Sequence, residues 1–330
     1  MTLLPDTAPA LVVTAHGGPE VLSVREEAVS LPGPGELLVH VAAAGLNFID
    51  VYQREGVYEV PVPFVAGNEG AGEVVRVGEG VTEVVVGDRV AWAMALGSFS
   101  RYAVVPAAAV VPVPSDLDTG RAAAVTLQGM TAHFLTSSAY PVQRGTVALV
   151  HAAAGGVGAL LVQMLKAAGA RVVATAGSPE KCETARARGA DVALDTSSVS
   201  DLAAAVREAT GGRGVDVAYD GVGQATFDAS LASLRPRGLL VLFGAASGQV
   251  PPLDLQRLNR GGSLFVTRPT LSDYIATPAE LRGRAEEVFL AVANGSLHVE
   301  VAGRYPLEDA GTAYAALEGR RTRGKVLLVP

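Results

Sequence analysis

The chain has 330 residues, of which 49% are hydrophobic and 18% are charged, so it has the composition of a globular enzyme with room for two domains. Its net charge of −7 argues against nucleic acid as the main partner. The single cysteine, Cys182, excludes an internal disulfide framework and a cysteine-based metal cluster. The N-terminus "MTLLPDTAPA" lacks the basic start of a signal peptide, and we therefore expect a cytoplasmic protein.

The first 125 residues predict antiparallel β structure. Short valine-rich runs alternate with glycine turns in "ELLVHVAAAG", "GAGEVVRVGEG", "GDRVAWA" and "SRYAVVP". Short strands bounded by turns, without helices between them, are typical of a partly open barrel.

The uncharged run 146–165 has 20 residues, about the length of a membrane span, but its pattern argues against one. The run breaks at a glycine pair, 155–156, and its period changes there. "TVALVHA" predicts a buried strand, and the apolar residues from Val157 to Ala168 recur with the spacing of one helix face.

Strand, glycine turn and helix together predict a dinucleotide site. The spacing is Ala153-x-Gly155-x-x-Gly158, with alanine in place of the first glycine of the usual fingerprint. Gly155 would let the backbone approach a pyrophosphate, Gly158 would let the helix pack closely, and the helix N-terminus would offer free N–H groups. The predicted cofactor contacts of this turn are Ala153, Gly155, Gly156, Val157 and Gly158.

Further strand–helix units follow. "RVVATA", "DVALD", "VDVAYD" and "GLLVLFG" predict strands, and residues 179–188 and 199–210 predict helices. This alternation is typical of an α/β fold with a doubly wound parallel sheet. The C-terminal "GKVLLVP" predicts one more strand, which returns to the barrel because it could join the parallel sheet only through a crossover.

The ribose end of the predicted site lacks an acid. An NAD site usually carries Asp or Glu about 20 residues after the glycines, whereas this strand ends in "TAGSPEK". Glu180 lies inside the helix start, where it suits the helix dipole. Ser178 and Lys181 can accept a 2′-phosphate, which favours NADPH over NADH. The alternative is that Lys181 is an ordinary solvated lysine.

Segments along the whole length then point to one family. They are "GLNFIDVYQREGVY", "GNEGAGEVVRVGEGV", "GDRVAW", "LQGMTAHFL", "VHAAAGGVGALLVQMLKAAGA", "YDGVG", "GSLFVTRP" and "EGRRTRGKVLLVP". The chain resembles the zinc-free, zeta-crystallin-like quinone oxidoreductases of the medium-chain dehydrogenase/reductase superfamily. The resemblance implies a barrel-like catalytic domain from residues 1–126 and 269–330, with an NADPH-binding Rossmann domain, 127–268, inserted between them. It also implies a cleft between the domains and a homodimer with "SLFV" at its centre.

The resemblance assigns site residues as well. Asn47, Asp50 and Tyr52 would line the catalytic cleft, with Tyr52 donating a hydrogen bond to the acceptor oxygen. Two alternatives stay open: Tyr52 as a packed aromatic residue, and Asp50 as a residue that holds the barrel loop in place. The remaining cofactor contacts implied are Gln128, Thr131, Phe243 and Gly244 beside the nicotinamide, and Lys181 and Arg320 on the 2′-phosphate.

Two departures from relatives affect these expectations. Many relatives place an Asn-Tyr pair near the ribose end, where this chain has Asp195-Thr196, so one contact to NADPH is lost. The superfamily's zinc enzymes carry a Gly-His-Glu segment and an upstream cysteine, where this chain has Gly67-Asn68-Glu69 and "LNFID". Catalytic zinc needs three His, Cys or carboxylate ligands, so we predict no zinc.

Three functions are compatible with these observations. The first is an NADPH-dependent quinone oxidoreductase, in which hydride passes to a quinone without zinc. The second is a zinc-free enone or enoyl reductase of the same superfamily. The third is an NADPH-binding structural or RNA-binding protein. The acidic balance argues against RNA, and the retained cleft residues argue against a purely structural role.

Overall fold

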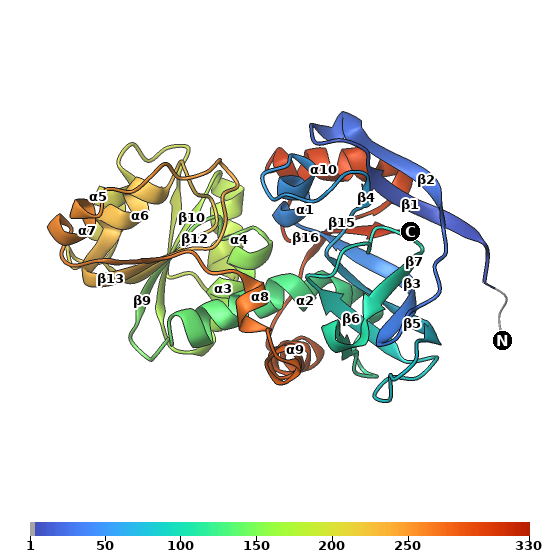
Figure 1. Cartoon of the computed structure of the whole chain (residues 1–330). Coiled ribbons are helices and arrows are strands. Elements are labelled where there is room, and N and C mark those ends of the chain that lie inside the picture. Colours follow the sequence, from blue (N-terminus) through green and yellow to red (C-terminus); the bar gives the residue numbers. More distant parts are fainter. Residues whose placement is uncertain (1–3) are drawn as a thin grey trace. The chain divides into compact units, whose positions relative to one another are not determined.

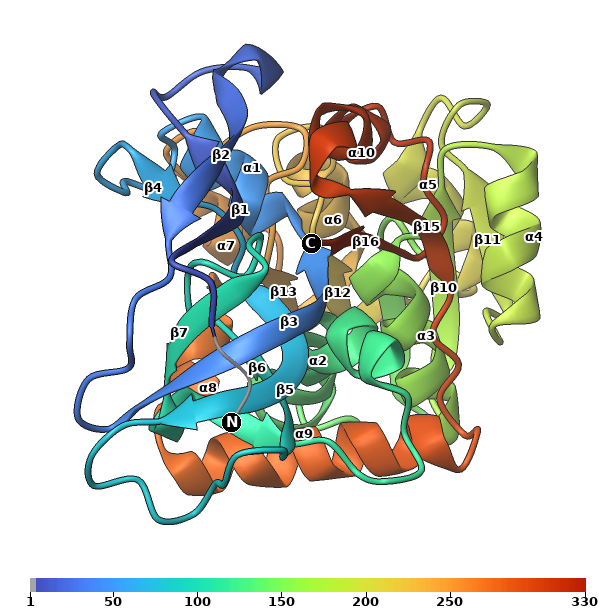
Figure 2. The ribbon, with the colours of Figure 1, turned by 90° about the vertical axis from the view of Figure 1, so that its right-hand side faces the viewer.

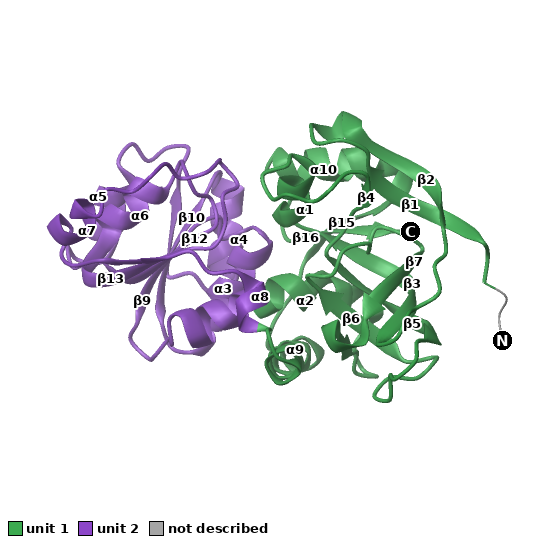
Figure 3. Cartoon of the chain, viewed as in Figure 1, with its two compact units in different colours: residues 1–130, 275–330 green, residues 131–274 purple. Residues whose placement is uncertain are grey.

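The computed structural model describes residues 4–330 (Figure 1). Residues 1–3, which begin the N-terminal stretch considered above, lie outside that range. The chain forms two compact units, unit 1 from residues 1–130 and 275–330 and unit 2 from residues 131–274 (Figure 3). The first division falls within helix α2 (Thr119–Phe134), and both divisions lie a few residues beyond the expected boundaries at 126/127 and 268/269. No described helix is long and apolar enough to cross a membrane.

Unit 1 is built on a seven-stranded sheet in the order β15-β16-β3-β5-β6-β8, with β7 paired to β3. The strands are β3 (Glu36–Leu46), β5 (Glu69–Val77), β6 (Arg89–Ala93), β7 (Tyr102–Pro106), β8 (Val110–Pro112), β15 (Val301–Pro306) and β16 (Lys325–Val329). The pairs are antiparallel except β15 with β16, which is parallel. Figure 2 shows β16 beside β3, so the C-terminal strand returns to this sheet as predicted.

A smaller sheet and several helices complete unit 1. The sheet has the order β2-β1-β4. Its strands are β1 (Thr7–Val13), β2 (Leu22–Ala28) and β4 (Phe64–Val65). The helices are α1 (Phe48–Arg54), α2, α9 (Pro278–Ala293) and α10 (Ala310–Glu318), with short 3-10 turns η1 (Pro19–Val21), η2 (Ala107–Ala109) and η4 (Leu307–Asp309). Its core is closed by large side chains that are fully buried, among them Trp92, Phe99 and Tyr314.

Unit 2 is a six-stranded parallel sheet in the order β11-β10-β9-β12-β13-β14. The strands are β9 (Val147–Val150), β10 (Arg171–Ala176), β11 (Val192–Asp195), β12 (Val215–Asp220), β13 (Leu234–Leu242) and β14 (Phe265–Thr267). Its helices are α3 (Gly156–Ala167), α4 (Pro179–Ala187), α5 (Leu202–Ala209), α6 (Phe227–Ser233), α7 (Gln256–Arg260) and α8 (Leu271–Tyr274), with a π-helical turn η3 (Leu135–Ala139). The uncharged run 146–165 is strand β9, a glycine turn and the start of α3, as expected.

The strand order places the reversal of the winding between β9 and β12. Ligands of doubly wound sheets bind at the carboxyl ends of the strands on either side of such a reversal. The helix expected from residue 199 begins only at Leu202, because the Asp201 side chain accepts the N–H of Ala204 at 2.9 Å and caps it there. The loops that follow β9 and β12 are therefore the first place to look for a site.

Candidate functional site

The loop after β9 makes a tight turn into α3. Ala152 lies in the left-handed region, with φ of +49°, although it is not a glycine. Its carbonyl accepts the N–H of Gly155 at 2.8 Å, and Gly155 is the N-cap of α3. Gly156 and Val157 form the first turn of that helix, whose N–H groups have no partners within the helix. This geometry suits an anion such as a pyrophosphate.

Two small residues permit this turn. A Cβ at Gly158 would lie 2.3 Å from the carbonyl oxygen of Ala152, so any side chain there would push the helix away from the turn. Ala153, in place of the fingerprint's first glycine, is fully buried and donates its N–H to the carbonyl of Thr175 at 3.0 Å. The close packing expected at Gly158 is therefore present, and alanine fits at 153.

The end of β10 carries no acid. The strand ends at Ala176, and Ser178 is the N-cap of α4, where its hydroxyl accepts the N–H of Lys181 at 3.3 Å. The nearby Asp195 carboxylate accepts the N–H and the hydroxyl of Ser197, at 2.9 and 2.7 Å. This carboxylate is thus engaged within its own loop.

The loop after β12 is organised by Asp220, which is fully buried. Its Oδ1 accepts the N–H groups of Val222 and Gly223 at 2.9 and 3.0 Å. The carbonyl of Asp220 accepts the N–H of Phe243 at 2.9 Å, and a Cβ at Gly244 would lie 2.4 Å from the carbonyl oxygen of Gly221. The predicted residues Phe243 and Gly244 therefore pack directly on this loop. This role of Asp220, within the segment "YDGVG", is not predicted from the sequence.

Unit 1 gathers several predicted residues into a buried polar cluster. Asn47 donates from Nδ2 to Glu69 Oε2 at 2.8 Å. Its Oδ1 accepts from Gln128 Nε2 at 3.2 Å and from Lys325 Nζ at 2.6 Å. Asn47, expected to be catalytic, and Gln128, expected beside the cofactor, are thus hydrogen-bonded to each other. Thr131, one helical turn further along α2, is nearly buried in unit 2.

Asp50 lies in the first turn of α1 and is 2% exposed. Its Oδ2 accepts the backbone N–H of Asn47 at 2.8 Å, and its Oδ1 accepts from Asn68 Nδ2 at 2.7 Å. Desolvation by burial raises the pKa of Asp50 to about 7, against the hydrogen bonds from Asn68 and Asn47, which lower it. These contacts fit the alternative in which Asp50 holds the loop that starts α1.

A buried ion pair closes the cluster. Lys325 Nζ donates to Glu69 Oε2, and both side chains are almost completely shielded from solvent. Glu69 Oε1 accepts the N–H of Leu127 at 2.6 Å, so the pair connects β16, β5 and α2. Burial lowers the pKa of the Lys325 ammonium, although Glu69 opposes this. Sequence analysis treated Lys325 only as part of a strand; the available signal was a lysine at the start of an otherwise apolar run.

Tyr52 lies on α1 in a short row of aromatic side chains. Its ring centroid is 6.1 Å from that of Phe48 and 5.3 Å from that of Tyr58, the latter in an edge-to-face arrangement. Tyr52 is half-buried and Tyr58 is more exposed. Arg320 is exposed and follows α10, with a left-handed φ of +54°.

The donor set of unit 1 does not fit zinc. Within residues 4–330 no three His, Cys, Asp or Glu side chains are grouped so that they could hold a metal ion. Asn68, at the histidine position of the zinc enzymes, donates to Asp50 and, at 2.6 Å, to Gln53 Oε1. The neighbouring carboxylate, Glu69, already binds the ammonium of Lys325. Neutral amides and an internal cation stand where zinc would need anionic or imidazole ligands.

Comparison with known proteins decides the family. Residues 33–115 match the family model described as alcohol dehydrogenase GroES-like domain, and residues 156–277 match the one described as zinc-binding dehydrogenase. The chain is 44% identical to a quinone oxidoreductase of Pseudomonas aeruginosa, over 96% of this chain and 98% of that protein. The chain belongs to the quinone oxidoreductases of the medium-chain dehydrogenase/reductase superfamily.

Two further proteins are similar to the chain over nearly its whole length. The crystal structure of Escherichia coli quinone oxidoreductase complexed with NADPH is 41% identical, with a TM-score of 0.96 and coverage of 98% of this chain and 100% of that one. A 2-haloacrylate reductase from Burkholderia sp. is 40% identical over 97% of this chain and 98% of that protein. The family and the fold class predicted from sequence are confirmed for this quinone oxidoreductase.

The raised pKa of Asp50 gives a test of the cluster. With a pKa of about 7 in the folded state against an ordinary 3.8, Asp50 keeps a proton that the unfolded chain releases. Its contribution to stability is therefore fully present below about pH 4 and is lost as the pH rises to about 7. The free energy of unfolding of the wild type minus that of Asp50→Asn should fall by about 2–4 kcal/mol between pH 4 and 7. Denaturant titrations at several pH values measure it; a difference that stays constant or rises with pH contradicts the expectation.

Proposed function

We propose that this chain is an NADPH-dependent quinone oxidoreductase that reduces quinones without zinc. The carrying observation is the turn 152–158, whose geometry suits a pyrophosphate and whose neighbouring strand ends without a ribose-binding acid. The names of relatives over 40% identical, one of them complexed with NADPH, support the same activity. The proposed partners are a small-molecule quinone and a second copy of the chain. The proposed location is the cytoplasm.

In this proposal each unit has a distinct task. NADPH, when bound, supplies the hydride. Unit 2 would hold its pyrophosphate on the N–H groups at the start of α3, with Ser178 and Lys181 toward the 2′-phosphate. In unit 1, Tyr52 would donate a hydrogen bond to the quinone oxygen, on which negative charge develops as hydride arrives. A quinone accepts hydride readily, so water can supply the proton that completes the hydroquinone and no metal is required.

The second candidate is an enone or enoyl reductase, which the 2-haloacrylate reductase relative favours. The third, an NADPH-binding structural or RNA-binding protein, is disfavoured by the net charge of −7. A panel of acceptors separates the three. We expect NADPH oxidation with quinones at a kcat/KM at least tenfold above that with enones, enoyl thioesters and 2-haloacrylate. The reverse order would support the second function, and no oxidation with any acceptor would support the third.

The proposed 2′-phosphate contacts predict cofactor selectivity. Removing either positive charge, in Lys181→Ala or Arg320→Ala, should cost about 1.5–3 kcal/mol of NADPH binding, because each donates a charge-assisted bond. The NADPH affinity should then fall roughly tenfold to a hundredfold, with little change for NADH. Titration calorimetry with both cofactors measures this. Arg186→Ala is the control, because Arg186 lies on α4, as Lys181 does, but pairs with Glu183.

Equal weakening of NADPH and NADH would mean that these residues support the fold and do not select the phosphate. A wild type that prefers NADH would mean that Asp195 binds the ribose of the cofactor.

The metal prediction is tested on the purified protein. We expect no stoichiometric zinc by elemental analysis and full activity in a strong chelator, because Asn68 and the paired Glu69 are unsuitable ligands. Zinc near one atom per chain, with activity lost on its removal, would overturn this prediction.

The proposed homodimer rests on strand β14. It lies at the end of the parallel sheet, and no strand of the described chain pairs with its outer edge. Phe265 on this strand is 60% exposed. An apolar open edge favours pairing with a twin. Light scattering at micromolar concentration should give a dimer for the wild type and a monomer for Phe265→Asp. The control is Leu290→Asp, at a site on α9 that is 64% exposed; a monomeric wild type would refute the proposal.

A further inference from the structure

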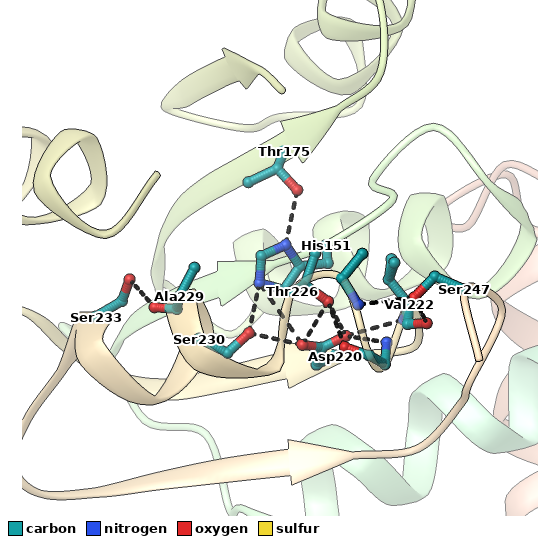
Figure 4. A network of polar contacts seen from close by, with 11 residues as sticks. His151, Thr175, Asp220, Val222, Thr226, Ala229, Ser230, Ser233 and Ser247 are labelled. Atoms are coloured by element: carbon teal, nitrogen blue, oxygen red, sulfur yellow. Dashed lines mark hydrogen bonds and ion pairs between the residues drawn. The ribbon is translucent and has the colours of Figure 1, made fainter. Parts of the chain in front are cut away.

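A continuous chain of hydrogen-bonded side chains lies beneath the glycine turn of unit 2 (Figure 4). Its members are Thr175, His151, Ser230 and Asp220, none more than 2% exposed. His151 Nδ1 lies 2.9 Å from Thr175 Oγ1, and His151 Nε2 lies 2.8 Å from Ser230 Oγ. Ser230 Oγ donates to Asp220 Oδ2 at 2.6 Å. The hydrogen-bonded chain therefore joins β10, the residue that follows β9, helix α6 and the end of β12.

The hydrogen bonds fix the tautomer of His151. Ser230 gives its proton to the Asp220 carboxylate, so its oxygen must accept from an N–H at Nε2 of His151. The other ring nitrogen, Nδ1, then accepts the hydroxyl proton of Thr175. Every group has a partner when the imidazole is neutral. Burial lowers the pKa of His151, and Asp220, 4.0 Å away, is the charged group that opposes this.

Two members of this hydrogen-bonded chain, His151 and Asp220, adjoin the two loops of the candidate cofactor site. His151 immediately precedes Ala152, whose left-handed backbone is strained because its Cβ crowds the following carbonyl oxygen. Such strain persists only where the surroundings hold the residue in place. Asp220 ends the hydrogen-bonded chain, and its second oxygen accepts the N–H groups of Val222 and Gly223. The same buried chain thus restrains the turn after β9 and the loop after β12.

We propose that His151 and Ser230 are positioning residues for the cofactor: their buried chain keeps Ala152 in its left-handed conformation, so that the N–H groups at the start of α3 are in place before the pyrophosphate arrives. This inference rests on the proposed use of NADPH. A preformed site binds more tightly because the loop loses no further conformational freedom on binding. The role concerns the pyrophosphate and therefore applies equally to NADPH and NADH.

A cycle of variants tests the link between the chain and Ala152. Ser230→Ala should weaken binding of both NADPH and NADH about tenfold and raise KM for NADPH with kcat unchanged. Ala152→Gly alone should leave affinity nearly unchanged, because the turn is already held and glycine accepts positive φ. In the double variant Ala152→Gly/Ser230→Ala, the affinity for the cofactor should fall only about threefold. Glycine adopts the positive φ without strain, so the turn keeps its conformation when Ser230 no longer supports it. Losses that simply add would overturn the proposal.

The matched control is Ser233→Ala. Ser233 lies on the same helix and is fully buried, but its hydroxyl donates to the carbonyl of Ala229 at 2.7 Å and stands outside the chain (Figure 4). Its substitution should leave cofactor affinity unchanged; a loss as large as that of Ser230→Ala would mean that only the packing of α6 matters. Thr175→Val tests the far end of the chain if Ser230→Ala fails to fold.

Amide hydrogen exchange gives a readout without cofactor. The N–H of Ala153 donates to the carbonyl of Thr175 and that of Gly155 to the carbonyl of Ala152, and the exchange of both should accelerate in Ser230→Ala and slow again in the double variant. Unchanged exchange in Ser230→Ala would overturn the positioning role even if the protein binds NADPH. A wild type that binds no NADPH, with exchange responding as expected, would instead overturn the proposed function.

Discussion

The ion pair between Lys325 and Glu69 is the constraint on which unit 1 depends. Two charges are held away from water, and their removal from solvent is costly unless they remain together. Breaking such a pair by deleting one partner typically costs about 3–5 kcal/mol, because the other charge stays buried alone. Both members of the pair are also hydrogen-bonded to Asn47, and Glu69 accepts the N–H of Leu127. The pair therefore positions the start of α1 and the middle of α2. The candidate catalytic helix therefore depends on a strand from the far end of the chain.

Unit 2 holds its loops with a chain of hydrogen bonds that ends on a single carboxylate. Hydrogen bonds join its buried side chains in the order Thr175, His151, Ser230 and Asp220. Among these four, only Asp220 is charged. That charge is balanced by backbone N–H groups and hydroxyls and not by a cation. Both units thus position loops of the candidate site with buried polar groups.

Local patterns were sufficient for most of the fold. The change from strand to helix period at 155–156, the glycine spacing and the alternation of units predicted β9, α3 and the parallel sheet, and each depends on residues close together in sequence. The predicted domain boundary at 126 lies a few residues before the division between the units, and α2 runs through that division without a break. Lys325, Ser230 and Asp220 were missed as site residues for a physical reason. Lys325 and Asn47 are separated by 278 positions, and no local periodicity reports a contact of that kind.

The return of residues 325–329 to the N-terminal sheet has a consequence for biosynthesis. Unit 2 is one continuous segment, so all its strands are available once residue 274 has left the ribosome. Unit 1 requires both ends, and Glu69 has no cation to pair with until Lys325 is synthesised. During translation, the N-terminal part of unit 1 therefore lacks strands β15 and β16 until the whole of unit 2 has been synthesised. Non-local closure of this kind is slow and exposes strand edges to chaperones and to aggregation. Unit 2, which carries the turn 152–158, can therefore fold before unit 1 has received strand β16.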